Sequence, residues 1–502
     1  LSSTSLSQVS RAGDAWNNRS VRLDTSWSTS FPEEMLTLRI GDTLTATTSW
    51  SRSMRMGGVQ IGTNFSLQPY RVTIPLPEFM GSATLPSRVE LYVNGMKQYS
   101  GNVPAGPFQL NTVPGINGAG NAQVMLTNAL GQVTTLDFSL YNTPILLQKG
   151  LSDWSAELGV VRENYGLASF DYDDNPASSG TWRHGFSSNF TGEFHGEVTR
   201  DLTNAGAGGN WLLGSVGVVS ASAAHSQSRG LSGSQYSLGY SWTSSRYNFG
   251  VNGMRADDDY RDTASLYGGP PPELSASAQA GFSTDHLGSF GLNYVHLRYQ
   301  QQPASRYASA YWYKSAGRRM TLSLNVNQNL DQRRDRSFFM SLNLSLDDRI
   351  YMSAGVQHDG DRNLYTVNAT QSVPTAGGFG WRAQLQQGEG TQGGQAELDY
   401  LGRYGQVQAG ISNMAGSHYT YAGANGSVVL MGGGLFAARQ IYGGFAVVST
   451  DGVPNVPVKL ENNLVGTTDR SGHLLVTPLN AYQNNKLSID PMDLPAGVRI
   501  TR

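Results

Sequence analysis

The hydrophobic residues in the middle of the chain recur at every second position, which is the period of a β-strand with two chemically different faces. Residues 320–326 place Met and three aliphatic side chains on one face, and Thr, Ser and Asn on the other. Residues 338–346 repeat the pattern, and after Asp347-Asp348 the apolar face resumes over 350–356. Two alternating runs joined by a short Asp-rich turn predict a β-hairpin. Similar stripes occur at 236–242, 247–251 and 407–411.

The polar faces of these stripes favour an all-β membrane barrel over a soluble sandwich. They consist almost wholly of Ser, Thr, Asn, Gln and Gly, which suits a water-filled lumen, and aromatic residues cluster near strand ends, as at 311–313. No run approaches the roughly 18 consecutive apolar residues of a membrane helix. The 60 glycines and the low charged fraction of 14% are typical of strands joined by turns. At about 16 residues per strand and connection, we expect about 23 strands, or roughly 22–24 in a bacterial barrel of even number.

Two segments depart from the barrel pattern and divide the chain into four parts. Residues 79–144 contain short strands and prolines, which predict an inserted β-sandwich that could gate a lumen of this width. After residue 443, short strands with Pro/Gly turns predict a second, periplasmic β-sandwich. The expected order is barrel strands in 1–78, the plug-like insert in 79–144, further barrel strands in 145–443 and the C-terminal module in 444–502. The core of the insert is expected to contain Val89, Leu91, Val93, Val124, Leu126, Leu136, Phe138 and Leu140.

Charge and motif content argue against nucleic-acid binding, metal binding and catalysis. The formal net charge is −2, so no basic surface is indicated. The chain has no cysteine, its eight histidines are scattered without an HExxH motif, and no GxSxG or Walker-type loop is present. We therefore expect no enzyme, no cofactor and no metal. Two acidic segments, 171–174 and 257–259, could attract Ca²⁺, but solvated extracellular loops are the simpler interpretation.

Charged residues inside predicted strands are expected to face the lumen. A charged side chain at the lipid midplane costs roughly 2–4 kcal/mol, whereas the lumen is aqueous. Some of these residues could pair with the insert and hold it in a closed position. The residues concerned are Glu157, Arg162, Glu193, Glu197 and Arg200.

Short motifs spread along the whole chain resemble the fimbrial ushers of the chaperone–usher pathway. Gly41-Asp42 and residues 57–62 resemble the early barrel strands of that family, and the insert and the C-terminal module each carry a further motif. The motif that resembles the usher plug comprises Tyr92, Val93, Asn94, Gly95, Gly106, Pro107 and Phe108. The motif that resembles the first C-terminal periplasmic domain comprises Gly466, Thr468, Asp469 and Gly472.

This resemblance implies an outer-membrane pore of about 24 strands that is closed by its plug at rest. Such a protein receives chaperone–subunit complexes and secretes the growing pilus by donor-strand exchange, a form of strand addition. The implied partners are these complexes, pilus subunits and outer-membrane lipid, with a possible homodimer. Ushers also have an N-terminal periplasmic domain and a second C-terminal domain, so we expect this chain to be a fragment. The family's short helix near the plug cannot be placed from the sequence.

The residues alone leave three other interpretations. The first is a passive or ligand-specific transporter with the insert as its lid; a TonB-dependent transporter would carry its plug before any barrel strand, whereas barrel-like strands precede this insert. An enzyme barrel, such as a protease or lipase, would need a clustered His/Asp/Ser constellation. A secreted all-β adhesin would not need lumen-like polar faces over so many hairpins.

Overall fold

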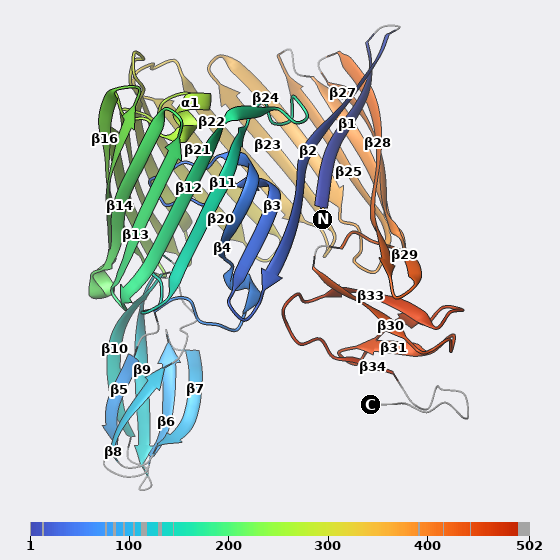
Figure 1. The fold of residues 1–502 in the computed structure, drawn as a ribbon, viewed down its shortest axis with the longest axis horizontal. Helices are drawn as coiled ribbons and strands as arrows, with labels where there is room; N and C mark the ends of the chain where they lie inside the picture. The colour runs from blue at the N-terminus through green and yellow to red at the C-terminus, as the bar shows by residue number, and fades with distance from the viewer. Residues whose placement is uncertain are drawn as a thin grey trace. The chain divides into compact units, whose positions relative to one another are not determined.

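The computed structural model describes residues 2–12, 15–75, 78–83, 87–93, 96–103, 106–111, 118–128, 133–143, 145–389, 392–414, 416–441 and 443–489. Nearly all of them lie in antiparallel β-strands (Figure 1). The chain forms two compact units, Leu1–Trp312 with Asn327–Arg334, and Tyr313–Val326 with Asp335–Arg502. Among the described residues, no helix is both long and apolar enough to cross a membrane.

Thirteen described strands of the first unit pair side by side in one antiparallel sheet, in chain order except that β5–β10 are left out. Tight turns join many of them: Arg229 and Gly230, with φ of 49° and 84°, link two strands in the left-handed backbone conformation that two-residue hairpins favour. The strands are β1 (Ser2–Ala12), β2 (Ala15–Phe31), β3 (Leu36–Leu44), β4 (Arg55–Thr63), β11 (Ser152–Arg162), β12 (Tyr172–Ser187), β13 (Phe190–Thr199), β14 (Leu202–Leu212), β15 (Val218–Ser228), β16 (Leu231–Thr243), β17 (Tyr247–Ala256), β18 (Leu274–Thr284) and β19 (Gly288–Arg298). The short helices η1 (Phe65–Leu67), η2 (Gly214–Val216) and α1 (Thr263–Tyr267) lie between them.

The strands on either side of the insert are hydrogen-bonded neighbours. β4 and β11 pair continuously from Gly62 opposite Ser155 to Met56 opposite Val161. Gly58 lies so close to the backbone of β11 that a Cβ atom there would clash, which is the close approach that glycine permits. The insert therefore interrupts the sequence without interrupting the sheet.

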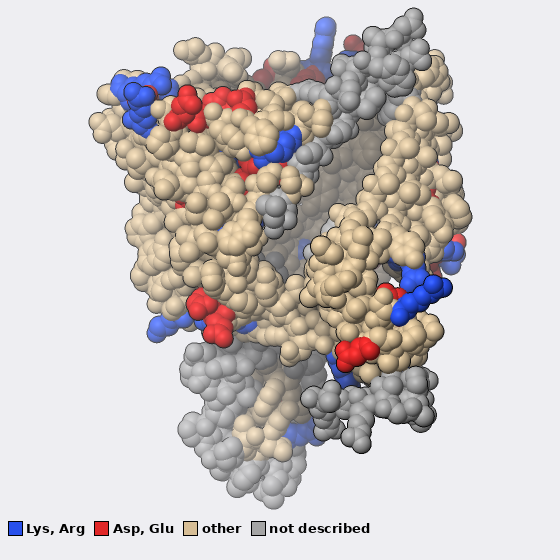
Figure 2. All heavy atoms as spheres, turned by 45° about the vertical axis from the view of Figure 1, so that its right-hand side comes forward, with Lys and Arg blue, Asp and Glu red and all other residues tan. Residues whose placement is uncertain are grey.

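Alternate residues of the long strands differ in chemistry and in exposure. In β13, Phe194 and Val198 are 47% and 51% exposed, whereas Glu193, His195 and Glu197 on the opposite face are buried. An apolar exterior with a buried polar face is the reverse of a soluble protein and is typical of a membrane barrel wall. On the side of the molecule shown in Figure 2, Lys, Arg, Asp and Glu gather toward the strand ends, and other residues form the surface between them.

The insert forms two small sheets of its own. β5 (Glu78–Ala83) pairs with β8 (Gly106–Asn111), and the second sheet has the order β10 (Val133–Asn142), β9 (Gly118–Asn128), β6 (Ser87–Val93), β7 (Met96–Val103). Four of the eight predicted core residues are confirmed as buried, because Val89, Leu91 and Val124 are fully covered and Leu126 nearly so. The side chains of the other four, Val93, Leu136, Phe138 and Leu140, lie outside the described set.

The second unit contains most of the remaining long strands and two small C-terminal sheets. Within it β22 to β29 pair consecutively, while β20 and β21 run across the boundary between the units. In the described residues, 23 strands lie outside the small sheets, close to the predicted number. The long strands are β20 (Ser305–Ala316), β21 (Met320–Asn329), β22 (Arg336–Ser345), β23 (Ile350–Asp359), β24 (Arg362–Gln371), β25 (Gly378–Gly388), β26 (Gly393–Leu401), β27 (Gly405–Met414), β28 (Ser417–Met431) and β29 (Gly434–Ala438).

Two small sheets form the C-terminal part of the chain. β30 (Gly444–Ser449) pairs with β33 (His473–Leu479), and β31 (Pro457–Leu460) lies between β32 (Asn463–Thr467) and β34 (Leu487–Ile489). Val456, Val458 and Val476 are buried in this part of the chain. The predicted boundaries of the four parts stay predictions.

Candidate functional site

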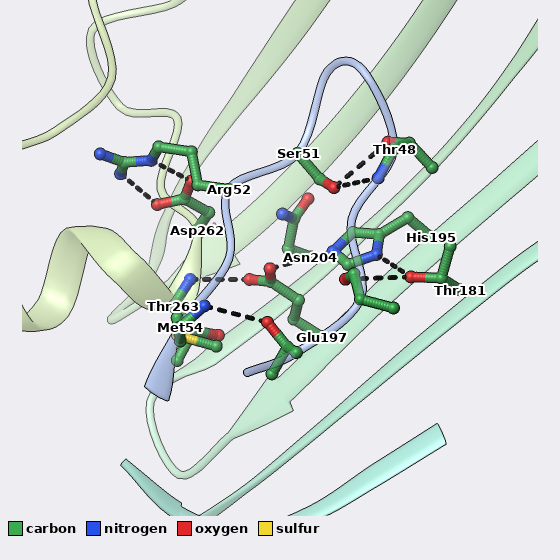
Figure 3. A network of polar contacts seen from close by, with 12 residues as sticks. Thr48, Ser51, Arg52, Met54, Thr181, His195, Glu197, Asn204, Asp262 and Thr263 are labelled. Atoms are coloured by element: carbon green, nitrogen blue, oxygen red, sulfur yellow. Dashed lines mark hydrogen bonds and ion pairs between the residues drawn. The ribbon is translucent and has the colours of Figure 1, made fainter. Parts of the chain in front are cut away.

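The connection between β3 and β4, residues 45–54, folds onto the polar face of the sheet instead of forming a tight turn (Figure 3). We call it the infolded segment. Its two ends are closed by a backbone bond from Thr45 N to the Met54 carbonyl oxygen at 2.9 Å and by a bond from Met54 N to Thr45 Oγ1 at 3.0 Å. These two bonds fix the ends of the segment, so the residues between them project as one loop.

Trp50 anchors the tip of the infolded segment. Its side chain is 6% exposed and packs against Ala224, Ala256 and Tyr260, and its ring meets the His195 ring edge-on at a centroid distance of 5.8 Å. Gly206 provides the space, because a Cβ atom there would lie 2.7 Å from the Trp50 ring. Burial of the indole gives the segment one apolar attachment, and Met54, which packs against Met56 and Val161, gives it another.

Arg52 joins the infolded segment to the residues that carry α1. Its guanidinium forms a two-point ion pair with Asp262, in which Nε donates to Oδ2 at 2.6 Å, and also donates to Ser265 Oγ at 2.8 Å. Asp262 in turn caps α1 by accepting the backbone N–H of Ser265 at 2.9 Å. Burial disfavours the charged carboxylate of Asp262, but the hydrogen bonds and charge of Arg52 outweigh burial and place its pKa below the ordinary value.

Two buried carboxylates on the polar face of the sheet accept backbone hydrogen bonds from the infolded segment and from the segment that carries α1. Glu197 accepts the backbone N–H of Thr263 at 2.7 Å and contacts His195 Nε2 at 3.0 Å. Glu157 accepts the backbone N–H of Ala46 at 3.2 Å. Among the described residues, no group of three or more His, Asp or Glu side chains is arranged to hold a metal ion. Glu157 and Glu197 thus join the sheet to the infolded segment and to the α1 segment, and Arg52 and Asp262 join these two segments to each other; we call this set of bonds the clamp.

The charged strand residues singled out from the sequence divide into two groups. Glu157, Glu193 and Glu197 are buried on the polar face. Arg162 is buried at the end of β11, where its guanidinium pairs with Asp42, and Arg200 is exposed in the turn after β13. Glu157 and Glu197 bond to the infolded segment and to the α1 segment. Their suggested pairing with the insert stays a prediction.

The Gly41-Asp42 motif forms a second polar cluster on the same sheet. Asp42 is buried and receives the guanidinium groups of both Arg22 and Arg162, and the hydroxyl of Tyr172 at 2.7 Å. Gly41 has a φ of +118° and lies against the backbone of β2, so a side chain would not fit. The motif ties β2, β3, β11 and β12 together.

The two acidic segments, 171–174 and 257–259, were predicted to be solvated loops, and the structure agrees only in part. The three residues 257–259 are exposed, as expected. Beyond them the chain turns inward, and Tyr260 and Asp262 are buried against the infolded segment. In the other acidic segment, Asp173 accepts a hydrogen bond from the Tyr267 hydroxyl of α1.

The plug-like motif falls on two strands of the insert. Tyr92 and Val93 end β6, while Gly106, Pro107 and Phe108 begin β8, opposite residues 81–83 of β5. Asn94 and Gly95 lie outside the described residues. The structure therefore places the two halves of the motif in different sheets.

The C-terminal motif forms a compact turn. Thr468, which is 1% exposed, donates to the Val453 carbonyl oxygen at 2.9 Å and accepts the backbone N–H of Val456 at 3.0 Å. Asp469 accepts the backbone N–H groups of Ser471 and His473, and these bonds lower the pKa of its carboxyl group, that from His473 most. Gly466 and Gly472 have φ of 158° and 74°.

Sequence reasoning missed the infolded segment and α1. Residues 45–54 are mostly Thr and Ser and show no period, and α1 has only five residues. A weak signal is present in hindsight: Trp50 and Arg52 stand in a polar connection that is long for a hairpin, and β14 places Gly206 and Gly208 on its polar face.

Comparison with known proteins gives a consistent match along the chain. A family model described as outer membrane usher protein matches residues 2–502. The outer membrane usher protein FimC of Bordetella pertussis is 26% identical, with 95% of this chain and 57% of that protein covered. YehB of Escherichia coli K12, also an outer membrane usher protein, is 24% identical over 97% of this chain and 63% of its own length. The chain thus spans about three fifths of the relatives it matches.

Two solved structures show the same fold. The E. coli P pilus tip assembly intermediate PapC-PapD-PapK-PapG matches with a TM-score of 0.72 and 18% identity, covering 100% of this chain and 64% of the other. The translocation pore of the P pilus usher PapC matches with a TM-score of 0.50 and 17% identity, covering 83% and 89%. The likeness confirms the predicted fold class, a large β-barrel with an inserted domain and a C-terminal β-sandwich module.

Proposed function

Because the chain belongs to the family of outer membrane usher proteins, we propose that it is a gated pore and an assembly platform for pili. The four expected parts are barrel strands in 1–78, a plug in 79–144, barrel strands in 145–443 and a periplasmic domain in 444–502. The plug closes the resting pore, and its displacement opens a passage for folded pilus subunits.

The position of the insert is the observation that carries this proposal. β4 and β11 pair directly, so the insert hangs from one point on the rim of an uninterrupted sheet. A domain attached in this way can move without breaking a strand pair of the wall. The polar face beside it, with Glu157, Glu193 and Glu197, suits a water-filled passage.

The infolded segment provides a second closing element in the proposal. It covers part of the polar face, and α1 holds it there through the Arg52–Asp262 ion pair. A pore of this width needs its lumen obstructed at rest, and a segment clamped by a few polar bonds can be displaced without unfolding the wall.

As an assembly platform, the protein receives chaperone–subunit complexes and joins subunits by donor-strand exchange. PapC has been solved together with PapD, PapK and PapG, which supports partners of this kind for the present chain. The folding of each subunit supplies the driving force, so no nucleotide, cofactor or catalytic step is required. In the proposed function, the protein therefore does not act as an enzyme.

Single-channel conductance in planar bilayers tests the proposal. The chain is compared with a variant whose residues 79–144 are replaced by a short linker. We expect small, brief openings from the intact chain and a large, steady conductance from the variant. Equal conductance from both would show that the insert is not a gate, and silence from both, with folding verified by heat-modifiable gel mobility, would show that the chain is not a pore.

A further inference from the structure

The two linkers that connect the insert to the sheet are each held to the sheet by specific contacts. The leading linker, residues 64–73, is fixed to β3 and to the turn that precedes it. Asn64 Nδ2 donates to Thr37 Oγ1 at 3.0 Å, and Gln68 Nε2 donates to the Pro32 carbonyl oxygen at 2.8 Å. Leu67 is 3% exposed, so this linker is packed as well as hydrogen-bonded.

The trailing linker, residues 145–151, lies flat on β12 and β13. Leu146 and Leu147 are buried, and the backbone N–H of Leu147 donates to Thr191 Oγ1 at 2.9 Å. Gly185 exchanges backbone bonds with Gly150 and Leu151 at 2.7 and 3.0 Å. A Cβ atom at Gly185 would lie 2.7 Å from the Leu147 carbonyl oxygen, so the close fit requires glycine.

Arg183 of β12 connects the trailing linker to the polar face. Its Nη2 donates to the Ile145 carbonyl oxygen at 2.7 Å, its Nε donates to Glu193 at 3.0 Å, and its Nη1 lies 3.5 Å from Asp153. Glu193 is buried and also accepts a bond from Asn210 of β14 at 2.8 Å. One guanidinium thus ties the first described residue after the insert to three strands of the wall, and such charge-assisted bonds are the strong ones.

The two linkers are also bonded to each other. Gln148 N donates to the Thr73 carbonyl oxygen at 2.9 Å. Together with the attachments to the sheet, this bond closes the linkers into a ring at the root of the insert, which we call the collar (residues 64–73, 145–151 and Arg183).

We propose that the collar stays intact in every state of the pore, and that the plug moves as one body from this fixed base. Arg183 is the positioning residue that sets the base, so it determines how well the plug fits its closed position. This inference rests on the proposed function and adds how the gate is held. A plug on loose linkers would lose its orientation at each opening, whereas a plug on a fixed base returns to the same seat.

The first test combines Arg183→Gln with removal of the insert, and measures the fraction of time that single channels are open. With the insert present, we expect Arg183→Gln to raise the open fraction about tenfold. The bonds of Arg183 are the same in both states, so this effect comes from the closed plug, which fits its seat less well once its base is displaced; loss of about 1.4 kcal/mol of seating contacts gives a factor of ten. The conductance of the fully open state should not change. With residues 79–144 replaced by a linker, the substitution should have no effect. Arg246→Gln, which removes an exposed ion pair with Asp285, is the matched control.

The outcomes separate this inference from the proposed function. If removal of the insert changes nothing, the gate itself is disproved. If removal opens the pore but Arg183→Gln does not raise the open fraction, or raises it also without the insert, the collar is not the base of the plug.

A second test adds a covalent bond across the collar instead of removing one of its contacts. The chain has no cysteine, so Thr73→Cys with Gln148→Cys creates a single possible disulfide. Backbone-bonded neighbours have Cα atoms about 5–6 Å apart, within the range that a disulfide spans. We expect the bond to form on oxidation and to leave opening unchanged. Failure of the bond to form, or abolition of opening after it forms, would overturn a permanent collar.

Discussion

At the scale of single residues, the Arg52–Asp262 ion pair is the contact of the clamp that a substitution can break most selectively. The Asp262 side chain is 7% exposed and that of Arg52 is 37% exposed, so only one partner is well shielded from water. The pair nevertheless serves two purposes, because Asp262 also caps α1. Loss of the charge should therefore free the infolded segment while leaving most of the cap in place.

Asp262→Asn should loosen the infolded segment and increase leakage through the pore. Asparagine can still cap α1, but the lost charge weakens the bonds from Arg52 by roughly 1–3 kcal/mol, discounted for partial exposure. Uptake of a bulky antibiotic by cells measures the leak, and we expect about a tenfold increase or more. Arg229→Gln, which breaks an exposed pair with Asp201, should leave uptake unchanged; an equal rise in both would contradict the clamp.

The same residue predicts how the leak depends on pH. The pKa of Asp262, which lies outside the strands, is lower in the folded protein than its ordinary value. Its stabilising contribution is therefore complete above a pH of about 4 and is lost only as pH falls through the lower, folded-state pKa. The contribution of Asp262 to the closed state should therefore be constant between about pH 5 and 8. A rise in leak within this window that Asp262→Asn abolishes would contradict the assignment.

At the scale of elements, the strands are defined by two faces with opposite requirements. β16 shows this clearly: Leu238 is 64% exposed on the apolar face, and Ser241 lies on the opposite face, paired with Val218 and Gly250. One face contacts lipid and the other contacts water or the clamp. The same substitution should therefore have different effects on the two faces.

Leu238→Arg should impair folding into lipid vesicles, whereas Ser241→Arg should be tolerated. A cation on the lipid face costs roughly 2–4 kcal/mol at the midplane, and a lumen position carries no such cost. The measurement is the fraction of protein that shows heat-modifiable mobility after refolding. Equal yields from both variants would contradict the assignment of faces.

Gly472→Ala should destabilise the C-terminal turn. Gly472 has a φ of +74°, and a Cβ atom there would lie 2.6 Å from the Gly452 nitrogen. Strain of this kind costs about 1–3 kcal/mol, so limited proteolysis of the full chain should cut the C-terminal part faster. Gly433→Ala is the control, since Gly433 also has a positive φ, of 78°, but open space around it.

At the scale of the whole molecule, sequence reasoning succeeded where the signal is local and periodic. Alternation predicted hairpins such as β22–β23, and short strands with prolines indicated the insert. It failed at residues 45–54, because the partners that fix Trp50 and Arg52 lie far along the chain, at Ala224 and Asp262. Contacts of this kind leave no period in the sequence. Of the five charged residues predicted to face the lumen, Glu157, Glu193 and Glu197 lie on the polar face, whereas Arg200 lies in a turn. The bond from Glu197 to the α1 segment could not be foreseen.

The clamp and the plug should act as two separate barriers. Asp262→Asn alone, removal of the insert alone, and the two together give a double-mutant cycle measured by conductance. Independent barriers give free-energy changes that add within about 0.5 kcal/mol. A coupling much larger than this would show that the infolded segment acts through the plug, and would merge the two elements into one gate.

The bond between Thr73 and Gln148 has a consequence that we expect for the order in which the protein folds. β4 can pair with β11 only after the chain between Gly62 and Ser155 has closed into a loop. The entropy cost of closure grows with the logarithm of loop length, by about 0.6 kcal/mol per doubling. Once the insert has folded and its linkers have met, only short stretches on either side remain to be ordered. The domain that blocks the finished pore thus also brings together the two strands between which it is inserted, so that a defect in its folding becomes a defect in building the wall.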